Sequence, residues 1–144
     1  MVKIGIKVSE AMTKNPVTIS KETSLPLCAR KMLSQNIGAV LIKEKNELIG
    51  IITEKDIVEN AVAKELNIKK SKVKDIMMTT MITIAPDADL SEAVTIMIRE
   101  NVRRLPVIKN KKLVGLLTLR DILYAQPKLF EKLYECFIKK KVKK

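Results

Sequence analysis

Apolar and polar residues in the first half of the chain follow two short-range patterns, one typical of strands and one typical of helices. Val17 to Ile19 predicts a short strand, and Ser24 is a suitable helix cap because its hydroxyl can accept a hydrogen bond from a first-turn N–H group. Apolar residues then recur at helical spacing, which predicts an amphipathic helix that ends near Asn36 to Gly38. The apolar stripe of this helix consists of Leu25, Cys28, Ala29, Met32 and Leu33.

Two short apolar runs after this helix predict a β-hairpin. Ala39 to Ile42 is separated from Leu48 to Ile52 by the polar stretch Lys43 to Glu47, which predicts the turn. Thr53 then begins a second predicted helix, and Leu66 to Lys72 is expected to link this unit to the rest of the chain. The predicted order of elements is therefore β-α-β-β-α.

The same pattern returns in the second half of the chain. Residues 8–57 align with residues 73–122 at a constant shift of 65 residues and without a gap. A register preserved over this length identifies an internal repeat, because chance similarity does not maintain it. The identical pairs include Val8/Val73, Met12/Met77, Thr18/Thr83, Leu25/Leu90, Met32/Met97, Asn36/Asn101, Gly50/Gly115, Thr53/Thr118 and Asp56/Asp121.

The second copy contains its own version of each element. Asp89 is the predicted helix cap, and Glu92 at the third helical position indicates a capping box. Leu105 to Ile108 and Leu113 to Leu117 predict the hairpin, and Thr118 begins the following helix. The helical stripe consists of Leu90, Ala93, Val94, Met97 and Ile98.

These elements predict an α/β fold of the α+β type, with two tandem β-α-β-β-α units and a C-terminal helix. Each unit has too few strands to bury its own faces, so the two are expected to pack together with pseudo-two-fold symmetry. The predicted boundaries are residues 1–66 for the first unit, 67–125 for the second and 126–144 for the C-terminal amphipathic, basic helix.

Composition excludes several classes of protein. The longest apolar runs are far shorter than the roughly 20 residues of a membrane helix, and the N-terminus has no continuous apolar signal region, so a cytoplasmic protein without membrane contact is expected. Cys28 and Cys136 have no metal or redox spacing and are interpreted as packing residues. With no histidine, no glycine-rich phosphate loop and no recognisable nucleophile and base, the chain is predicted to be neither an enzyme nor a metal protein.

Charge indicates the kind of partner without identifying it. The chain has 28 Lys and Arg residues against 16 Asp and Glu residues, a formal net charge of +12. Such an excess favours anionic partners, which include nucleotides, nucleic acids and acidic protein surfaces.

Matching strings at the end of both hairpins resemble a known family. Gly50-Ile-Ile-Thr-Glu-Lys-Asp56-Ile and Gly115-Leu-Leu-Thr-Leu-Arg-Asp121-Ile are similar to the signature of the cystathionine β-synthase (CBS) domain. The openings Val8-Ser-Glu-Ala-Met-Thr13 and Val73-Lys-Asp-Ile-Met-Met78 resemble it too, so that the likeness covers about residues 8–124. A tandem CBS pair implies a regulatory module that binds AMP, ATP or S-adenosylmethionine in clefts between the repeats and requires no cofactor.

The Thr-x-x-Asp motif in each copy has two readings. A hydroxyl and a carboxylate one helical turn apart, beside unpaired backbone N–H groups, suit a ribose and a phosphate. The same pair caps a helix with no ligand present. The resemblance adds the first role to the second: it implies that Asp56 and Asp121 accept hydrogen bonds from ribose hydroxyls and that Thr53 and Thr118 lie near the phosphate.

Cations are distributed unequally between the two copies. The resemblance implies that Arg103, before the second hairpin, reaches a ligand phosphate, with Arg120 as a weaker candidate. In the first copy Gly38 stands at the position of Arg103, and only Lys55 stands opposite Arg120. Unequal sites are therefore expected, and for the first site an adenosyl ligand without phosphates, such as S-adenosylmethionine or methylthioadenosine, is as plausible as AMP.

Thr18 and Thr83 follow the first strand of each copy. The resemblance implies that they lie near an adenine pocket that is lined partly by main chain. Their other reading, as ordinary strand threonines, carries equal weight.

Two alternative functions remain open at this point. The lysine clusters at Lys69 to Lys74 and Lys139 to Lys144 are compatible with nucleic-acid binding, although the few aromatic residues are not interleaved with basic ones as in single-strand binders. The other alternative is a dimerising adaptor whose sites do not bind ligand.

The C-terminal helix is also expected to need a partner surface. Its apolar stripe either folds back on its own module or packs against a second copy, and a homodimer is the preferred interpretation. The stripe consists of Leu129, Phe130, Leu133, Phe137 and Ile138.

Overall fold

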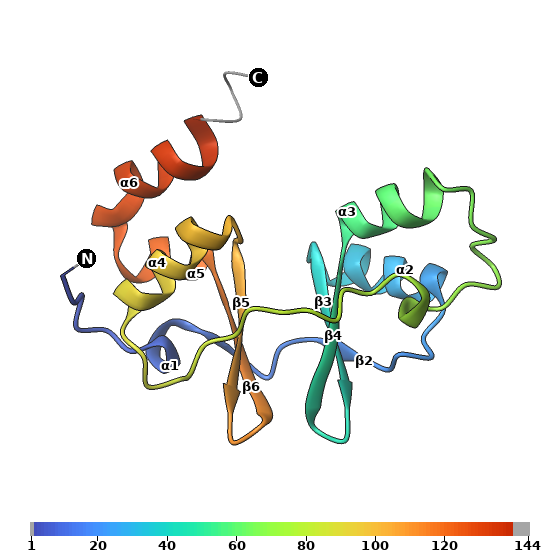
Figure 1. Cartoon of the computed structure of the whole chain (residues 1–144), viewed down its shortest axis with the longest axis horizontal. Helices are drawn as coiled ribbons and strands as arrows, with labels where there is room; N and C mark the ends of the chain where they lie inside the picture. The colour runs from blue at the N-terminus through green and yellow to red at the C-terminus, as the bar shows by residue number, and fades with distance from the viewer. Residues whose placement is uncertain (1, 140–144) are drawn as a thin grey trace. The chain divides into compact units, whose positions relative to one another are not determined.

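The protein, described over residues 2–139 by a computed structural model, consists of two compact units. The repeat-1 unit contains residues 16–81 together with 111–113, and the repeat-2 unit contains residues 2–15, 82–110 and 114–139. Each unit has one three-stranded sheet and several helices, so the predicted mixed α/β fold is confirmed. In each unit the two helices of the repeat lie on the same side of its hairpin (Figure 1).

The sheet of the repeat-1 unit has the strand order β2-β3-β4. Strand β2 is parallel to β3, with Thr18 opposite Leu41, and β3 is antiparallel to β4, with Ala39 opposite Thr53. The hairpin turn is tighter than predicted, because the polar residues on both sides of it continue the ladder at its exposed end. The elements are β2 (Thr18–Ile19), α2 (Leu25–Gln35), β3 (Ala39–Glu44), β4 (Glu47–Thr53), α3 (Glu54–Asp56), the π-helical turns η1 (Ile57–Val62) and the 3-10 turn η2 (Val73–Asp75).

The repeat-2 unit repeats this arrangement and carries the chain's C-terminal helix. Its sheet has the order β1-β6-β5, and an isolated bridge joins Ile84 in parallel to Val107 of β5. The elements are α1 (Val8–Ala11), β1 (Thr13–Lys14), α4 (Leu90–Glu100), β5 (Arg104–Lys109), β6 (Lys112–Thr118), α5 (Leu119–Ala125), the 3-10 turn η3 (Pro127–Leu129), α6 (Phe130–Tyr134) and the π-helical turns η4 (Glu135–Lys139).

The two long helices begin and end as the sequence predicts. The Ser24 hydroxyl accepts a hydrogen bond from the N–H of Leu27 at 3.2 Å, and Asn36 ends the helix in the left-handed conformation with φ 52°. Asn101 ends α4 in the same way. These caps satisfy backbone groups that the helix itself leaves unpaired.

The capping box predicted for α4 is wrong in its second member. Asp89 does cap the helix, accepting a hydrogen bond from the N–H of Ser91 at 2.8 Å. Its backbone, however, lies in a β-bridge with Lys7, and its carboxylate also accepts hydrogen bonds from the N–H groups of Ile4 and Gly5. Asp89 therefore ties the N-terminal segment to α4, while Glu92 is exposed.

Each repeat lends its opening segment to the other unit. Residues 2–15, from repeat 1, pair with repeat 2: β1 is antiparallel to β6, with Thr13 opposite Leu116, and Val8 is fully buried in that core. Reciprocally, Met78 from repeat 2 forms a bridge with Ile51 of β4. Each compact unit therefore contains residues from both sides of the predicted boundary between residues 66 and 67.

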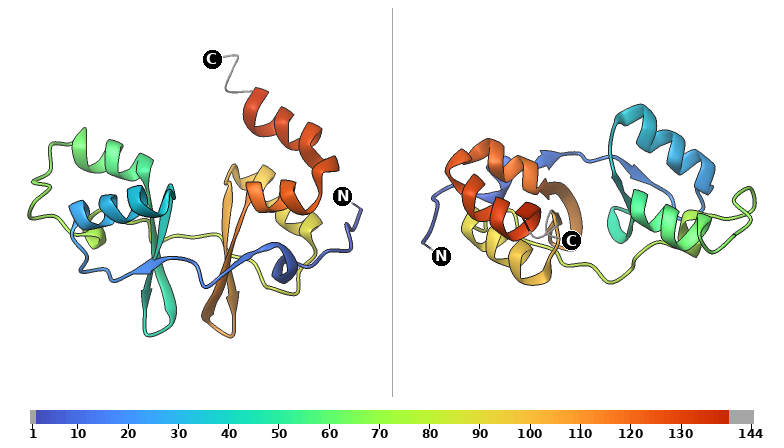
Figure 2. Two further views of the ribbon diagram at one scale, coloured as in Figure 1. Left: turned by 180° about the vertical axis from the view of Figure 1, so that it is seen from behind. Right: turned by 90° about the horizontal axis from the view of Figure 1, so that it is seen from above.

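The C-terminal helix folds back on its own unit. Leu133 is 1% exposed and Phe137 is 5% exposed, and both belong to the core formed by α4, β5 and β6. The views of Figure 2 show α6 beside α4 and α5. The expectation that a second copy covers the whole apolar stripe is wrong for these two residues, because the chain's own core covers them.

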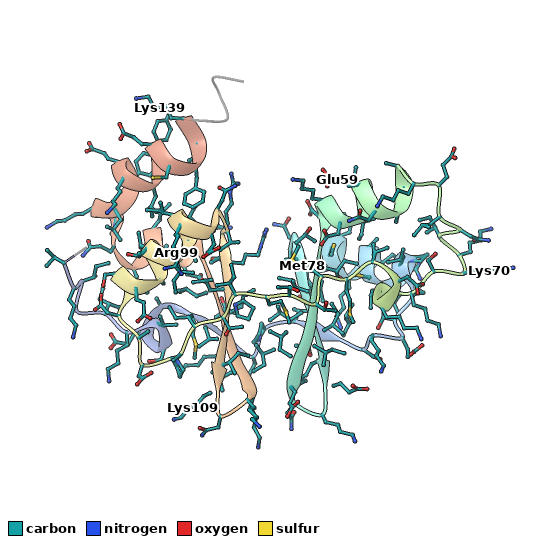
Figure 3. All side chains as sticks on the ribbon, in the orientation of Figure 1. Glu59, Lys70, Met78, Arg99, Lys109 and Lys139 are labelled. Carbon is teal, nitrogen blue, oxygen red and sulfur yellow. The ribbon has the colours of Figure 1, made fainter. Side chains whose placement is uncertain are left out.

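The two lysine clusters are only partly available to a partner. Lys72 and Lys74 pair with Glu22 at 2.7 Å and 2.8 Å, which ties the opening segment of repeat 2 to repeat 1. Lys139, at the end of the described tail (Figure 3), pairs with Glu135 at 3.7 Å. The remaining lysines of the predicted cluster, residues 140–144, lie outside the described part of the chain. Within residues 2–139 no helix has both the length and the apolar character to cross a bilayer.

Candidate functional site

The first Thr-x-x-Asp motif lies where β4 passes into a helix. Thr53 has an extended backbone, and its hydroxyl accepts a hydrogen bond from the N–H of Asp56 at 3.2 Å. In return, Oδ2 of Asp56 accepts from the Thr53 N–H at 2.8 Å and from the Thr53 hydroxyl at 2.9 Å. The motif is therefore a complete capping box, which confirms the structural reading of the sequence.

The second motif repeats this geometry at the end of β6. The Thr118 hydroxyl accepts from the N–H of Asp121 at 3.1 Å, and Oδ2 of Asp121 accepts from the Thr118 N–H at 2.9 Å. Both carboxylates are half-buried. Each copy thus fixes one carboxylate at the first turn of a helix.

Capping uses only part of each carboxylate. In the described part of the chain, the cap bonds of Asp56 and Asp121 all go to Oδ2, and Oδ1 makes no hydrogen bond. A carboxylate oxygen can accept further hydrogen bonds from ligand hydroxyls without giving up its cap. The capping role and the ligand role therefore do not exclude each other.

A backbone hydrogen bond places Arg103 beside the second motif. Its carbonyl accepts from the N–H of Leu119, the first residue of α5, at 2.9 Å. In the first copy the carbonyl of Gly38 accepts from Glu54 in the same way, at 3.0 Å. Only the second copy therefore has a cationic side chain at this position, as the sequence predicts.

The other predicted cations have different surroundings. Lys55 forms an exposed ion pair with Glu59 at 3.8 Å, one turn along its own helix; Figure 3 labels Glu59 on that helix. Exposed ion pairs of this kind contribute little to stability, so Lys55 can break its pair with Glu59 and contact a ligand with little loss of stability. Arg120 is exposed, and within residues 2–139 its side chain makes no ion pair or hydrogen bond.

The two strand threonines do not touch the motifs. Thr18 lies on β2 and is separated from Thr53, at the end of β4, by the middle strand β3. Two strand spacings correspond to about 10 Å. Thr83 precedes Ile84, which pairs with the outer side of β5. Only an elongated ligand can reach both a motif and the threonine of the same unit.

A shallow depression lies elsewhere in the repeat-2 unit. It has a volume of about 640 Å³, is lined at the start of α4 by Lys3, Lys7, Asp87 and Glu92 among others, and includes none of the predicted ligand residues. Hydrogen bonds from Ser91, and then from Ile4, hold the pKa of the adjoining Asp89 carboxyl well below its ordinary range. These bonds are structural, and the mixed charges of the lining do not select a ligand.

One contact was not foreseen from the sequence. The Nη2 atom of Arg103 donates a hydrogen bond to the backbone carbonyl of Phe137 at 3.4 Å, and its guanidinium carbon lies 5.9 Å from the centroid of the Phe137 ring. The aromatic residues near the C-terminus are the only sequence signal for it, and they do not indicate Arg103 as the partner.

Comparison with known proteins decides the family. Residues 8–63 and residues 73–128 each match the model of the CBS domain. The chain belongs to the CBS domain family. The two matches together cover more than half of the chain, so this protein is a tandem CBS pair and the predicted family is confirmed.

Proteins of different kinds contain regions similar to this CBS pair. An uncharacterized protein of Methanopyrus kandleri is 38% identical over 127 residues, which cover 87% of this chain and 65% of that protein. The inosine-5'-monophosphate dehydrogenase of Thermoplasma acidophilum is 30% identical over 88% of this chain but only 25% of the enzyme. The crystal structure of the CBS domain pair of protein MJ0100, in complex with 5'-methylthioadenosine and S-adenosyl-L-methionine, is 27% identical with a TM-score of 0.74 and covers 83% of this chain and 98% of that one.

Proposed function

We propose that this CBS pair is a regulatory sensor of adenosine-containing ligands, with one site at each Thr-x-x-Asp motif, and that it is not a catalyst. The proposal rests on the hydrogen bonding of the Asp56 and Asp121 carboxylates. In each, Oδ2 caps a helix, whereas Oδ1 makes no hydrogen bond within the described residues. A ribose presents two adjacent hydroxyl donors, which match such an acceptor. The MJ0100 domain pair, whose crystal structure contains adenosyl compounds, supports this ligand class.

The two sites are proposed to differ in the ligand that they prefer. Arg103 stands beside Thr118, and a guanidinium binds phosphate through charge-assisted hydrogen bonds. The repeat-2 site is therefore assigned to a phosphate-bearing nucleotide such as AMP or ATP. The repeat-1 site, with Gly38 in the corresponding place, is assigned to an adenosyl ligand without phosphates, such as methylthioadenosine or S-adenosylmethionine.

Predicted partners other than the ligand follow from exposed surfaces. A homodimer remains part of the proposal, and the tail residues open to a second copy are Phe130, Tyr134 and Ile138, which are 52%, 38% and 40% exposed. Within the proposed role, ligand occupancy would be transmitted to a protein that the CBS pair regulates.

Thermal unfolding with and without ligand tests the proposed function. A ligand that binds only the folded state at a concentration of one hundred times its Kd adds about 2.7 kcal/mol of stability by mass action. AMP, ATP and S-adenosylmethionine, each at millimolar concentration, are expected to raise the Tm by several degrees, while inorganic phosphate and ribose serve as controls. If none of the three ligands shifts the Tm, the sensor proposal is wrong.

A further inference from the structure

The C-terminal helix contacts Arg103, the candidate phosphate-binding residue of the repeat-2 site. Arg103 donates to the carbonyl of Phe137 at 3.4 Å, and its guanidinium faces the ring of the same residue at 5.9 Å from the centroid. Phe137 is 5% exposed and is fixed in the core with Leu133, whereas Arg103 is exposed. A firmly packed aromatic residue thus holds a long and otherwise flexible cationic side chain.

These contacts occupy only a small part of the guanidinium. Arginine has five N–H donors in a rigid planar arrangement, and Phe137 accepts from Nη2 alone. Within residues 2–139 the remaining donors make no hydrogen bond, and they can bind a phosphate group. Restricting the side chain before the ligand arrives reduces the conformational entropy that binding would otherwise lose.

The contact belongs to one site and has no counterpart at the other. The Arg103 carbonyl accepts from the N–H of Leu119, so the restrained side chain starts beside the Thr118 motif. The first repeat has Gly38 in this place, which offers no cation to restrain. Any effect of the tail on ligand choice is therefore confined to the repeat-2 site.

We propose that Phe137 is a positioning residue that holds Arg103 ready for the ligand's phosphate, and so makes the repeat-2 site selective for phosphate-bearing over phosphate-free adenosyl ligands. This inference rests on the proposed function. It assigns the C-terminal helix a role in ligand selection in addition to its role in the core.

Calorimetric titration of the full chain with AMP and with methylthioadenosine tests this role. Phe137→Leu keeps an apolar side chain in the core and removes the ring, and it is expected to weaken AMP binding about twofold to fivefold, the size of an exposed cation–π contact. Methylthioadenosine binding should not change. The matched control is Leu133→Met, which alters the same helix and the same core without touching Arg103, and it should change neither affinity.

A double variant decides whether the effect passes through Arg103. In an Arg103→Ala background, Phe137→Leu should have no further effect on AMP, because the group that Phe137 positions is gone. Tighter AMP binding by Phe137→Leu would mean that the tail sequesters Arg103, and an unchanged ratio of AMP to methylthioadenosine affinity would mean that it does nothing. Either result overturns the inference while the proposed function stands. If the wild type binds neither ligand, the proposed function itself fails.

Discussion

Alanine in place of Gly50 should destabilise the repeat-1 unit, because the opening segment of repeat 2 packs directly on this glycine. A Cβ atom at Gly50 would lie 2.7 Å from the sulfur of Met77 and 3.2 Å from the carbonyl oxygen of Met78. The methionine side chain can move, but two backbone hydrogen bonds of 2.8 and 2.9 Å tie Met78 to Ile51. Overpacking of such a site costs about 1–3 kcal/mol, and the movable side chain places Gly50→Ala near the lower end.

The equivalent change in the other unit should cost more. A Cβ atom at Gly115 would overlap the sulfur of Met12 more closely, and it would also lie 3.0 Å from the carbonyl oxygen of Thr13. That carbonyl belongs to β1, which is paired with β6 at this position. The backbone therefore has to move as well as the methionine, and Gly115→Ala is expected near the upper end of the same range of about 1–3 kcal/mol.

Urea unfolding of single and double variants provides the assay. Because Met77→Ala removes the atoms nearest to the new methyl group, Gly50→Ala should cost less in that background than in the wild type. The same rescue of Gly115→Ala by Met12→Ala should be less complete, since the carbonyl contact remains. A neutral Gly50→Ala, or strictly additive effects with Met77→Ala, would refute the exchange of opening segments.

Three further predictions concern charge, thiol reactivity and the tail. Hydrogen bonds from Lys72 and Lys74 lower the pKa of Glu22 from 4.5 to about 2, so the ionised carboxylate stabilises the fold above pH 4.5 and this stabilisation is lost as the pH falls toward 2. In thermal melts, the Tm of Glu22→Gln should therefore fall less between pH 4.5 and pH 2 than the Tm of the wild type. The same fall in Tm for both proteins would contradict the ion pair. Burial raises the pKa of the Cys28 thiol to about 11, so iodoacetamide should modify Cys136 alone in the native protein, and mass spectrometry showing two adducts without denaturant would disagree. Leu133→Ala should lower the free energy of unfolding, measured in urea, by about 2–5 kcal/mol because the side chain is buried in its own unit. Truncation of residues 126–144 should lower the Tm for the same reason. An unchanged Tm after truncation would show that the tail does not pack on this unit.

Local features of the fold could be predicted because they depend on residues close together in the sequence. The caps at Ser24 and Asp89 and the Thr-x-x-Asp motifs are hydrogen bonds within one helical turn, and their residue types identify them. The apolar runs predict the hairpins but make their strands too short, because the polar residues at the strand ends pair although no apolar pattern marks them.

The exchange of opening segments could not be predicted, for a reason inherent in the repeat. Met12 and Met77 are identical, and so are Gly50 and Gly115, so pairing within a repeat and pairing between repeats satisfy the sequence equally well. The contact of Arg103 with Phe137 joins residues 34 positions apart, with no periodicity to reveal it. Long-range choices of this kind depend on how the cores assemble.

The most direct test of the account is calorimetric titration of AMP into Asp56→Ala and Asp121→Ala. Both variants lose a capping box, which at Asp56 includes one more hydrogen bond, from the Thr53 hydroxyl. The cost of the lost cap is therefore no smaller in Asp56→Ala, and a larger loss of affinity in Asp121→Ala reports the ligand. Loss of a hydrogen bond to a charged group costs about 1.5–3 kcal/mol, which corresponds to a Kd roughly 10-fold to 150-fold weaker. The account predicts this loss of AMP affinity for Asp121→Ala and a much smaller one for Asp56→Ala. Equal losses would contradict the assignment of the phosphate-bearing ligand to the repeat-2 site, and unchanged affinity in both variants would contradict the Thr-x-x-Asp sites altogether.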